Sequence, residues 1–386
     1  MNQLNIKLFF SGDEYFSTLL QLIRDAETEI LFETYIFDFD PIGIQVLEEL
    51  RIAKQRGVSL RLLVDGVGSY NSVNRLYDFC KKNHISFRIY HPLPFELKII
   101  PRISWKGLQR LLFMFRRINK RNHRKIMTVD RKKILMGSFN VSQVHSEHYM
   151  GSKAWRDTGA LLIFPAYTLQ IENIIFAFMQ AWKKASYFSK ELFLAVTSSR
   201  KIKPHHDFSL FRLNHLVHWR FLLNRDLKKR IKNAKKQILI TNAYFLPRRS
   251  ILSHLKKAAR RGVDVQLILP RKSDVRLLEY ASRSLYYRLL KAGIQIYEYT
   301  PSMMHAKSLI IDDWAILGSQ NLNHRSLVHD LESDLVIDDV DLKTQLHQQW
   351  KNDLVKCHQF TIKDLGRLTL FERTLYRIIY WFRYWL

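Results

Sequence analysis

The feature that most constrains the fold of this chain is an internal repeat. The segment LIRDAETEILFETYIFDFD at 22–40 is similar to RIKNAKKQILITNAYFLPR at 230–248, and in each a polar helical run precedes a β-rich stretch. Each half continues with a helix that ends at a glycine and a new strand, and then with another helix and strand. This alternation predicts two similar α/β halves with largely parallel sheets flanked by helices.

The two halves differ in the length of the segment that precedes a histidine present in each half. Tyr90 is 33 residues before His123, whereas Tyr299 is only six residues before His305, so the first half carries an insertion. The polar segment TSSRKIKPHHDF indicates a linker between the halves. We expect a first half at 1–196 with a basic, aromatic insertion at 91–121, a linker at 197–208, a second half at 209–360 and a tail at 361–386.

Charge and composition limit the classes of partner that the chain can bind. The 62 Lys and Arg against 35 Asp and Glu leave a net charge of +27, which favours nucleic acid or anionic lipid. Cys80 and Cys357 lie far apart without a CxxC pattern, so neither a disulfide framework nor a zinc site is expected. We expect no signal peptide, and no uncharged apolar run reaches the roughly 18 residues that span a bilayer. Any membrane contact should therefore be peripheral.

One short motif occurs in both halves. NHRKIMTVD at 122–130 and MHAKSLIIDD at 304–313 each place a lysine two residues after a histidine and an aspartate five residues later. Side chains alternate along a strand, so each histidine and its lysine can enter one pocket. A turn, GSFN or GSQN, follows each motif and can bind an anion. The two sets are His123, Lys125, Asp130, Ser138 and Asn140, and His305, Lys307, Asp312, Ser319 and Asn321.

Together these residue types suit phosphodiester chemistry without a metal. One imidazole can attack phosphorus while the other protonates the leaving alcohol. Ammonium and amide groups can stabilise the oxygens on which charge develops. A lone His-x-Lys pattern would carry little information, because most histidines are structural. Its repetition in a duplicated chain predicts one site that both halves build.

On these residues the sequence resembles the phospholipase D superfamily, whose signature is His-x-Lys-x4-Asp followed by Gly-Ser-x-Asn, twice per chain. The resemblance covers residues 5–360 and includes the stretches FETYIFDFDPIG, WRDTG and GSQNLNHRS. Within the superfamily the chain is similar to bacterial cardiolipin synthases, in particular the shorter type without N-terminal transmembrane helices. The resemblance implies two phospholipase D-like halves packed as a pseudo-two-fold double domain with one shared active site.

Two departures from the family pattern stand out. Six residues separate Asp130 from Gly137 but only five separate Asp312 from Gly318, so we expect the second hairpin to be one residue shorter in its turn. The stretch GSFNVSQVHSEHYMGSKAWRD is looser than the usual synthase sequence, which bears on acceptor specificity more than on chemistry.

The resemblance also implies roles. One histidine becomes the covalent nucleophile, and we favour His123, with His305 as acid and then base. The phosphate should be held by Lys125, Lys307, Asn140 and Asn321, while Ser138 and Ser319 support the turn or donate to the phosphate.

Five acidic residues have separate expectations. Asp130 and Asp312 are at an odd offset from the histidines, on the opposite strand face, and should brace the structure rather than touch substrate. Each histidine needs an acceptor for its second ring nitrogen, and Asp157 and Glu332, on comparable strands, are candidates; a surface salt bridge is the alternative. Glu33, on a buried strand, is a candidate to line the pocket or bind a cation there.

Aromatic residues favour lipid over nucleic acid. The tail GRLTLFERTLYRIIYWFRYWL, as a helix, has a broad apolar face with Trp381 and Trp385 as interfacial anchors, the alternative being a helix packed on the core. The insertion, with Trp105, is either a lid or membrane-contacting element or a core helix with a solvated basic face.

We therefore predict a cardiolipin synthase, peripheral on the cytoplasmic side of the bacterial inner (cytoplasmic) membrane, with phosphatidylglycerol and cardiolipin as anionic phospholipid partners. A phosphatidyl-histidine intermediate would pass from one phosphatidylglycerol to a second, giving cardiolipin and glycerol. No cofactor and no metal are expected. The alternatives are a phospholipase D-type hydrolase or nuclease, and a non-catalytic binder of anionic membranes.

Overall fold

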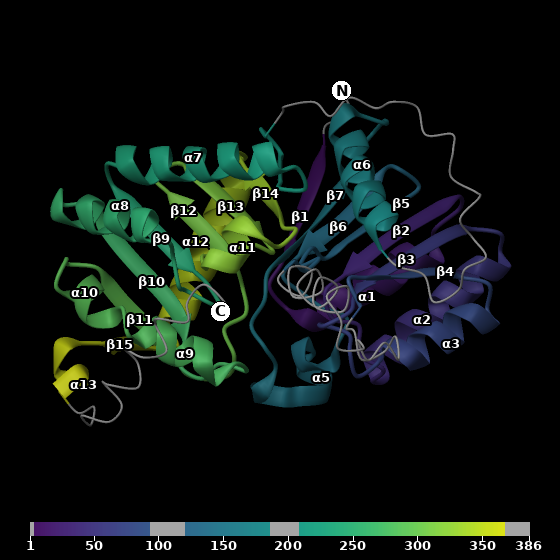
Figure 1. Ribbon diagram of the computed structural model, residues 1–386, viewed down its shortest axis with the longest axis horizontal. Helices are drawn as coiled ribbons and strands as arrows, with labels where there is room; N and C mark the ends of the chain where they lie inside the picture. Colours follow the sequence, from purple (N-terminus) through teal and green to yellow (C-terminus); the bar gives the residue numbers. More distant parts are fainter. Residues whose placement is uncertain (1–3, 93–119, 186–207, 367–386) are drawn as a thin grey trace, which may run out of the picture.

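The computed structural model describes residues 4–92, 120–185 and 208–366 (Figure 1). Most of the expected insertion, the linker and the amphipathic tail lie outside the described residues, at 93–119, 186–207 and 367–386. Across the described ranges, no helix combines the length and the apolar character that crossing a bilayer requires.

The described part of the first half is a seven-stranded sheet flanked by helices. Its strands run in the order β1-β7-β6-β5-β2-β3-β4. They are β1 Asn5–Phe9, β2 Glu29–Thr34, β3 Ser59–Asp65, β4 Ser86–Tyr90, β5 Ile126–Val129, β6 Lys133–Gly137 and β7 Gly159–Ile163. The helices are α1 Gly12–Arg24, α2 Pro41–Gln55, α3 Val73–Lys82, α5 Glu147–Met150 and α6 Leu169–Lys184, with short 3₁₀ turns at Gln143–His145 and Gly151–Lys153.

The second half repeats this sheet and adds one strand. Its order, β8-β14-β13-β12-β9-β10-β11-β15, matches the first sheet strand for strand, with β15 added next to β11. The strands are β8 Phe211–Leu213, β9 Gln237–Thr241, β10 Asp264–Pro270, β11 Gln295–Tyr299, β12 Ser308–Ile311, β13 Trp314–Gly318, β14 Ser333–Ile337 and β15 Cys357–Phe360. The helices are α7 Val217–Asn233, α8 Arg249–Arg260, α9 Arg276–Arg283, α10 Tyr286–Leu290, α11 His324–Val328, α12 Val340–Val355 and α13 Ile362–Gly366.

The sheets are mixed, with fewer parallel pairs than the alternation of helices and strands predicts. Among the strands of the described residues, only β2-β3-β4 and β9-β10-β11 pair in parallel. The motif strands β5 and β12 begin hairpins with β6 and β13, and tight turns force antiparallel pairing there. The turn has three residues in the first half and two in the second, so the expected difference in length does fall in the turn.

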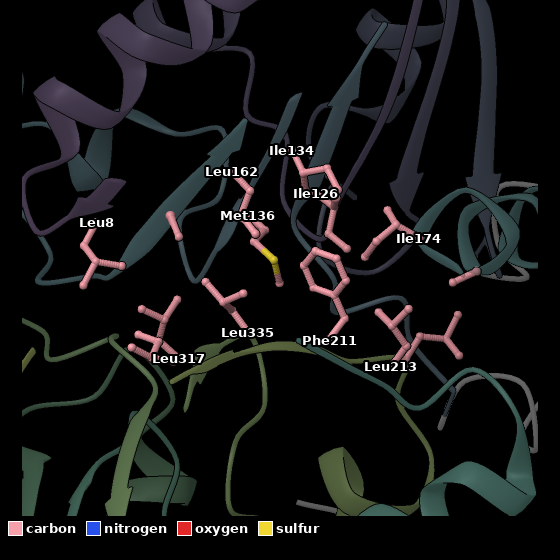
Figure 2. Packing of buried hydrophobic residues seen from close by; sticks show 14 of the residues in the cluster. Leu8, Ile126, Ile134, Met136, Leu162, Ile174, Phe211, Leu213, Leu317 and Leu335 are labelled. Atoms are coloured by element: carbon pink, nitrogen blue, oxygen red, sulfur yellow. The ribbon is translucent and has the colours of Figure 1, made fainter. Parts of the chain in front are cut away.

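The two sheets face each other across an apolar layer. Figure 2 shows Leu8, Met136 and Leu162 of the first half directed toward Phe211, Leu317 and Leu335 of the second, within one buried cluster. Each such side chain contributes roughly 1.5–3 kcal/mol when fully buried. Separate clusters pack α1, α2 and α3 on one sheet and α8, α9 and α10 on the other. The layer between the sheets fixes the halves relative to each other.

Candidate active site

The histidine of each motif lies on a segment that pairs with the other half. His123 and His305 lie just before β5 and β12 rather than inside a strand. The backbone N–H of His123 donates to the carbonyl of Leu331 at 3.0 Å, and that of His305 donates to the carbonyl of Arg156 at 2.8 Å. These contacts belong to short bridges between the halves, so both histidines lie where the halves meet.

One cavity receives both histidines. It has a volume of about 340 Å³ and lies between the halves. Its walls include the two histidines and both asparagines of the repeated turns. The other lining residues are Tyr35, Ile36, Val67, Gly68, Arg121, Trp155, Tyr244, Asp274, Val275, Leu278, Asn323, Arg325, Ser326 and Asp330.

Hydrogen bonds fix the ring orientation of both histidines. Nδ1 of His123 is 3.1 Å from both the carbonyl of Ser319 and Oε2 of Glu332. Nδ1 of His305 is 2.7 Å from Oδ1 of Asp157. Because a carbonyl or carboxylate oxygen accepts, Nδ1 carries the hydrogen in each ring. In the neutral ring, Nε2 then keeps its lone pair, as a nucleophile or base requires.

The two carboxylates cross between the halves. Asp157 of the first half contacts the histidine of the second, and Glu332 of the second contacts the histidine of the first. Both are almost fully buried, which is inconsistent with a surface salt bridge. They lie just before β7 and β14, not within strands. A Cβ on Gly137 would approach the carbonyl oxygen of Thr158 to 2.4 Å, so the glycine permits the close approach of the segment that carries Asp157.

The two carboxylates differ in ionisation. Burial acts to raise the pKa of Asp157, but His305 and His145 together hold that pKa well below its usual range. Burial raises the pKa of Glu332 to about 7, although Lys125 and two serine hydroxyls oppose the rise. Burial also lowers the pKa of both catalytic candidates, to about 3 for His305 and well below the usual value for His123. Both rings are therefore neutral near pH 7 before substrate binds.

Both motif lysines are buried behind the histidines. Nζ of Lys125 donates to the carbonyl of His123 at 2.7 Å, and Nζ of Lys307 donates to the carbonyl of His305. Neither lysine is among the residues that line the cavity. Burial lowers the pKa of Lys307 to about 8, and burial together with the charge of Lys307 holds the pKa of Lys125 well below its usual value. Neither amino group therefore reaches into the cavity from its place behind the histidine.

The turn residues divide into two kinds. Asn140 and Asn321 line the cavity, and Nδ2 of Asn140 finds no hydrogen-bond partner within the described part of the chain. Ser138 and Ser319 are outside the cavity wall. Ser138 donates to the carbonyl of Thr158 at 3.1 Å, and Ser319 donates to Oε2 of Glu332 at 2.5 Å. Their hydroxyls support the turns and are not directed at a phosphate.

The motif aspartates and Glu33 also lie away from the cavity. Asp130 accepts hydrogen bonds from the backbone N–H groups of residues 27–29, and Asp312 accepts from those of residues 235–237. Both brace the start of a neighbouring strand. Glu33 forms a buried ion pair of 3.0 Å with Arg124 and accepts a hydrogen bond from Asn122, and it is not among the residues that line the cavity.

Arg121, Arg325 and Asp330, which the sequence did not single out, line the cavity together. Arg121 is 3.5 Å from Asp65, and Arg325 is 3.2 Å from Asp330. The backbone N–H of Arg121 donates to Asp330 at 2.9 Å, which links the two halves. A single charged residue gives no periodic signal, so the sequence pattern could not identify these lining residues.

His145 is a second omission. It is fully buried, and its Nδ1 donates to Oδ2 of Asp157 at 2.7 Å. The three ligand-type atoms of His145, Asp157 and His305 lie within 4.8 Å of one another, a spacing that a metal could also use, although hydrogen bonds already join these groups. Aligning GSFNVSQVH with GSQNLNHRS places His145 against Ser326, and that comparison could have revealed it.

Comparison with known proteins agrees with the duplicated motif. A family model described as the cardiolipin synthase, PLD-like domain matches residues 19–149 and 227–354, once in each half. This chain belongs to that phospholipase D family. Cardiolipin synthase B of Salmonella typhi is 30% identical over 376 residues, which are 96% of this chain and 85% of that protein. A cardiolipin synthase of Clostridium perfringens is 29% identical over 385 residues, 96% of this chain and 74% of that protein.

Solved structures agree with the phospholipase D-like double domain. The crystal structure of phosphatidylserine synthase from Haemophilus influenzae Rd KW20 has a TM-score of 0.69 and 15% identity, and covers 98% of this chain and 92% of that one. Polyphosphate kinase from Porphyromonas gingivalis has a TM-score of 0.56 and 12% identity, covering 99% of this chain and 56% of that one. At these identities the comparison shows the fold alone, and it confirms two mixed sheets flanked by helices.

Proposed function

We propose that this phospholipase D family member is a cardiolipin synthase that uses phosphatidylglycerol as both donor and acceptor. The observation that carries the proposal is the pair of histidines, one from each half, on the wall of one cavity. Each presents Nε2 because its Nδ1 is hydrogen-bonded to a carboxylate of the other half. The similarity to named cardiolipin synthases supports a phospholipid as substrate.

In the first step Nε2 of His123 attacks phosphorus and forms a phosphorus–nitrogen bond. The bond from phosphorus to the glycerol oxygen breaks. His305, which takes up a proton on Nε2 when the phosphate anion of the substrate binds, gives that proton to the oxygen as glycerol leaves. The assignment follows from the carboxylates, because the anionic Asp157 stabilises an imidazolium at His305. His123 has a second acceptor in the carbonyl of Ser319, which keeps its nucleophilic tautomer.

In the second step a hydroxyl of another phosphatidylglycerol attacks the phosphatidyl-histidine. His305 takes the hydroxyl proton, and the phosphorus–nitrogen bond breaks to restore His123. The products are one cardiolipin and one glycerol from two phosphatidylglycerols. One phosphodiester replaces another, so no nucleotide is consumed. Asn140 and the buried lysines stabilise the negative charge on the phosphate oxygens in both steps.

The same proposal places the protein on an anionic membrane surface. The net charge of +27 favours such a surface, and Trp155, Val275 and Leu278 give the cavity wall apolar contacts for a lipid. We assign it to the cytoplasmic side of the bacterial inner membrane as a peripheral protein. The segments at 91–121 and 361–386 are proposed as the additional lipid-contacting elements.

Product analysis with phosphatidylglycerol vesicles tests this function. We expect cardiolipin and glycerol in equal amounts from the native protein, and neither product from His123→Ala or His305→Ala. His148→Ala is the matched control, because His148 is exposed and should leave turnover unchanged. Phosphatidic acid as the sole lipid product would mean a hydrolase, and cleavage of single-stranded DNA without lipid turnover would mean a nuclease.

A further inference from the structure

His145 connects two parts of the active site. Its Nδ1 donates to Oδ2 of Asp157 at 2.7 Å, while Oδ1 of the same carboxylate accepts from His305 at 2.7 Å. Its Nε2 accepts the backbone N–H of Asn140 at 3.3 Å. Both ring nitrogens therefore have hydrogen-bond partners, Nδ1 as the donor to Asp157 and Nε2 as the acceptor from Asn140.

Ser326 makes the same two contacts in the second half. Its hydroxyl accepts the backbone N–H of Asn321 at 3.0 Å and donates to Oε1 of Glu332. Both residues lie eight positions after the glycine of their turn. The duplicated fold thus uses one position to tie the turn asparagine to the carboxylate, with an imidazole in one half and a hydroxyl in the other.

In each pair, the length of one side chain compensates for the length of the other. A long imidazole meets the short aspartate, whereas a short hydroxyl meets the longer glutamate. Each combination spans the gap between turn and carboxylate. A serine at position 145 would leave Asp157 without this donor unless the carboxylate were also lengthened by one methylene.

We propose that His145 is a positioning residue that holds Asp157 as an oriented anion, so that His305 can protonate a poor leaving group. The inference rests on the proposed function in taking His305 as the acid. It extends that function by giving the two halves chemically different supports. The first-half support is built for acid–base work at His305, and the serine-based support of the second half serves the nucleophile.

The charges around His145 agree with this role. Asp157 is directly bonded to it, His305 is 5.7 Å away between ring centroids, and Asp38 interacts with it electrostatically. Titratable groups of α1 and of the second motif interact with the residues around it. Asp13 accepts a hydrogen bond from the adjoining Ser146, and Tyr15 and Lys307 interact electrostatically with Asp157. Removing the Nδ1 donor leaves Asp157 with His305 alone, so the carboxylate should protonate at a higher pH.

Leaving groups of different acidity provide the test. Glycerol leaves as an alkoxide and needs an acid, whereas p-nitrophenol leaves readily without one. We would measure kcat/KM, which covers the steps up to release of the first alcohol, for phosphatidylglycerol and for bis(p-nitrophenyl) phosphate. For His145→Ser we expect a loss of about tenfold or more with the lipid and less than about threefold with the aryl diester. The acidic limb of the lipid profile should also move to higher pH.

Rescue separates positioning from folding. The double variant His145→Ser, Asp157→Glu recreates the serine and glutamate pair of the second half and should recover most of the lost lipid activity. His145→Asn keeps a donor near the position of Nδ1 and should be intermediate. Ser326→Ala is the matched control on the nucleophile side, and it should slow both substrates alike. Thermal unfolding of each variant identifies those that do not fold.

Three outcomes would overturn the proposal. The first is a His145→Ser variant with unchanged kcat/KM for the lipid, and the second is an equal loss of kcat/KM on both substrates. The third is a double variant that unfolds like the native protein but is no more active on the lipid than His145→Ser. Failure of the proposed function is distinguishable. If the native protein makes no cardiolipin but cleaves phosphatidylethanolamine, the same leaving-group comparison is made with that lipid, and His145 is judged independently of the lipid's identity.

Discussion

Asp157 and Glu332 hold equivalent positions, yet replacing them should have unequal effects. Asp157 is the only hydrogen-bond acceptor that the described structure gives to Nδ1 of His305. His123 has a second acceptor, the carbonyl of Ser319 at 3.1 Å. Asp157→Asn should lower kcat by about 10²–10⁴, because the ring loses both its tautomer and its counter-charge. Glu332→Gln should cost roughly tenfold less.

Steady-state kinetics on phosphatidylglycerol with both isosteric variants checks this expectation. Equal losses, or a larger loss for Glu332→Gln, would contradict the assignment of His305 as the acid. Asp334→Asn is a useful companion, since Asp334 is another buried carboxylate whose pKa burial raises to about 7, and it contacts neither histidine.

Lys307 should set the alkaline limit of activity. Burial lowers its pKa to about 8, so in the free enzyme its charge disappears as the pH rises through that value. A bound phosphate anion stabilises the ammonium form and raises this pKa in the complex. We therefore expect kcat/KM to fall above about pH 8, with the fall in kcat at higher pH. In Lys307→Arg the charge persists, so the pH profile of kcat/KM for the variant should lack the alkaline limb that the native protein shows.

Among the elements, each motif hairpin is joined to the start of a neighbouring strand by hydrogen bonds to an aspartate in its turn. Asp130 and Asp312 have depressed pKa values, because backbone N–H groups outweigh the opposing effect of burial. The stabilisation is present above the unfolded pKa of about 4 and is lost as pH falls through the lower folded pKa. Asp130→Asn should thus lower Tm at pH 7, and the difference from the native protein should shrink near pH 3. Thermal unfolding of the native protein and of Asp130→Asn at both pH values checks this expectation. The kcat per folded molecule should be the same for the two proteins.

Sequence patterns predicted the elements better than their pairing. The helix and strand order of both halves, the duplicated motif and the shorter second turn could be predicted, because each depends on local spacing. The mixed pairing could not, because periodicity does not distinguish a parallel neighbour from an antiparallel one. Glu33 appeared to be a pocket residue because its partner, Arg124, lies 91 positions away, just before β5. The crossed contacts of Asp157 and Glu332 depend on how the halves pack, which no local pattern encodes.

At the scale of the whole molecule, one cavity requires both halves of the same chain. His123→Ala retains the second-half histidine, and His305→Ala retains the first, but each protein lacks one of the two rings. Mixing the two variants should restore no cardiolipin synthesis, because the apolar layer between the sheets holds each pair of halves together. Activity in the mixture approaching a quarter of native would instead mean that chains exchange halves. Product analysis after co-incubation and after co-expression distinguishes these cases.

The crossed carboxylates also have a consequence for biosynthesis. Glu332 follows its partner His123 by 209 positions, so a ribosome needs about 10 to 40 seconds to supply it after the first ring has emerged. Throughout that interval the nascent chain carries His123, the proposed nucleophile, without the carboxylate that orients its ring. Translation itself therefore delays assembly of the complete candidate site until the second half of the chain has been made.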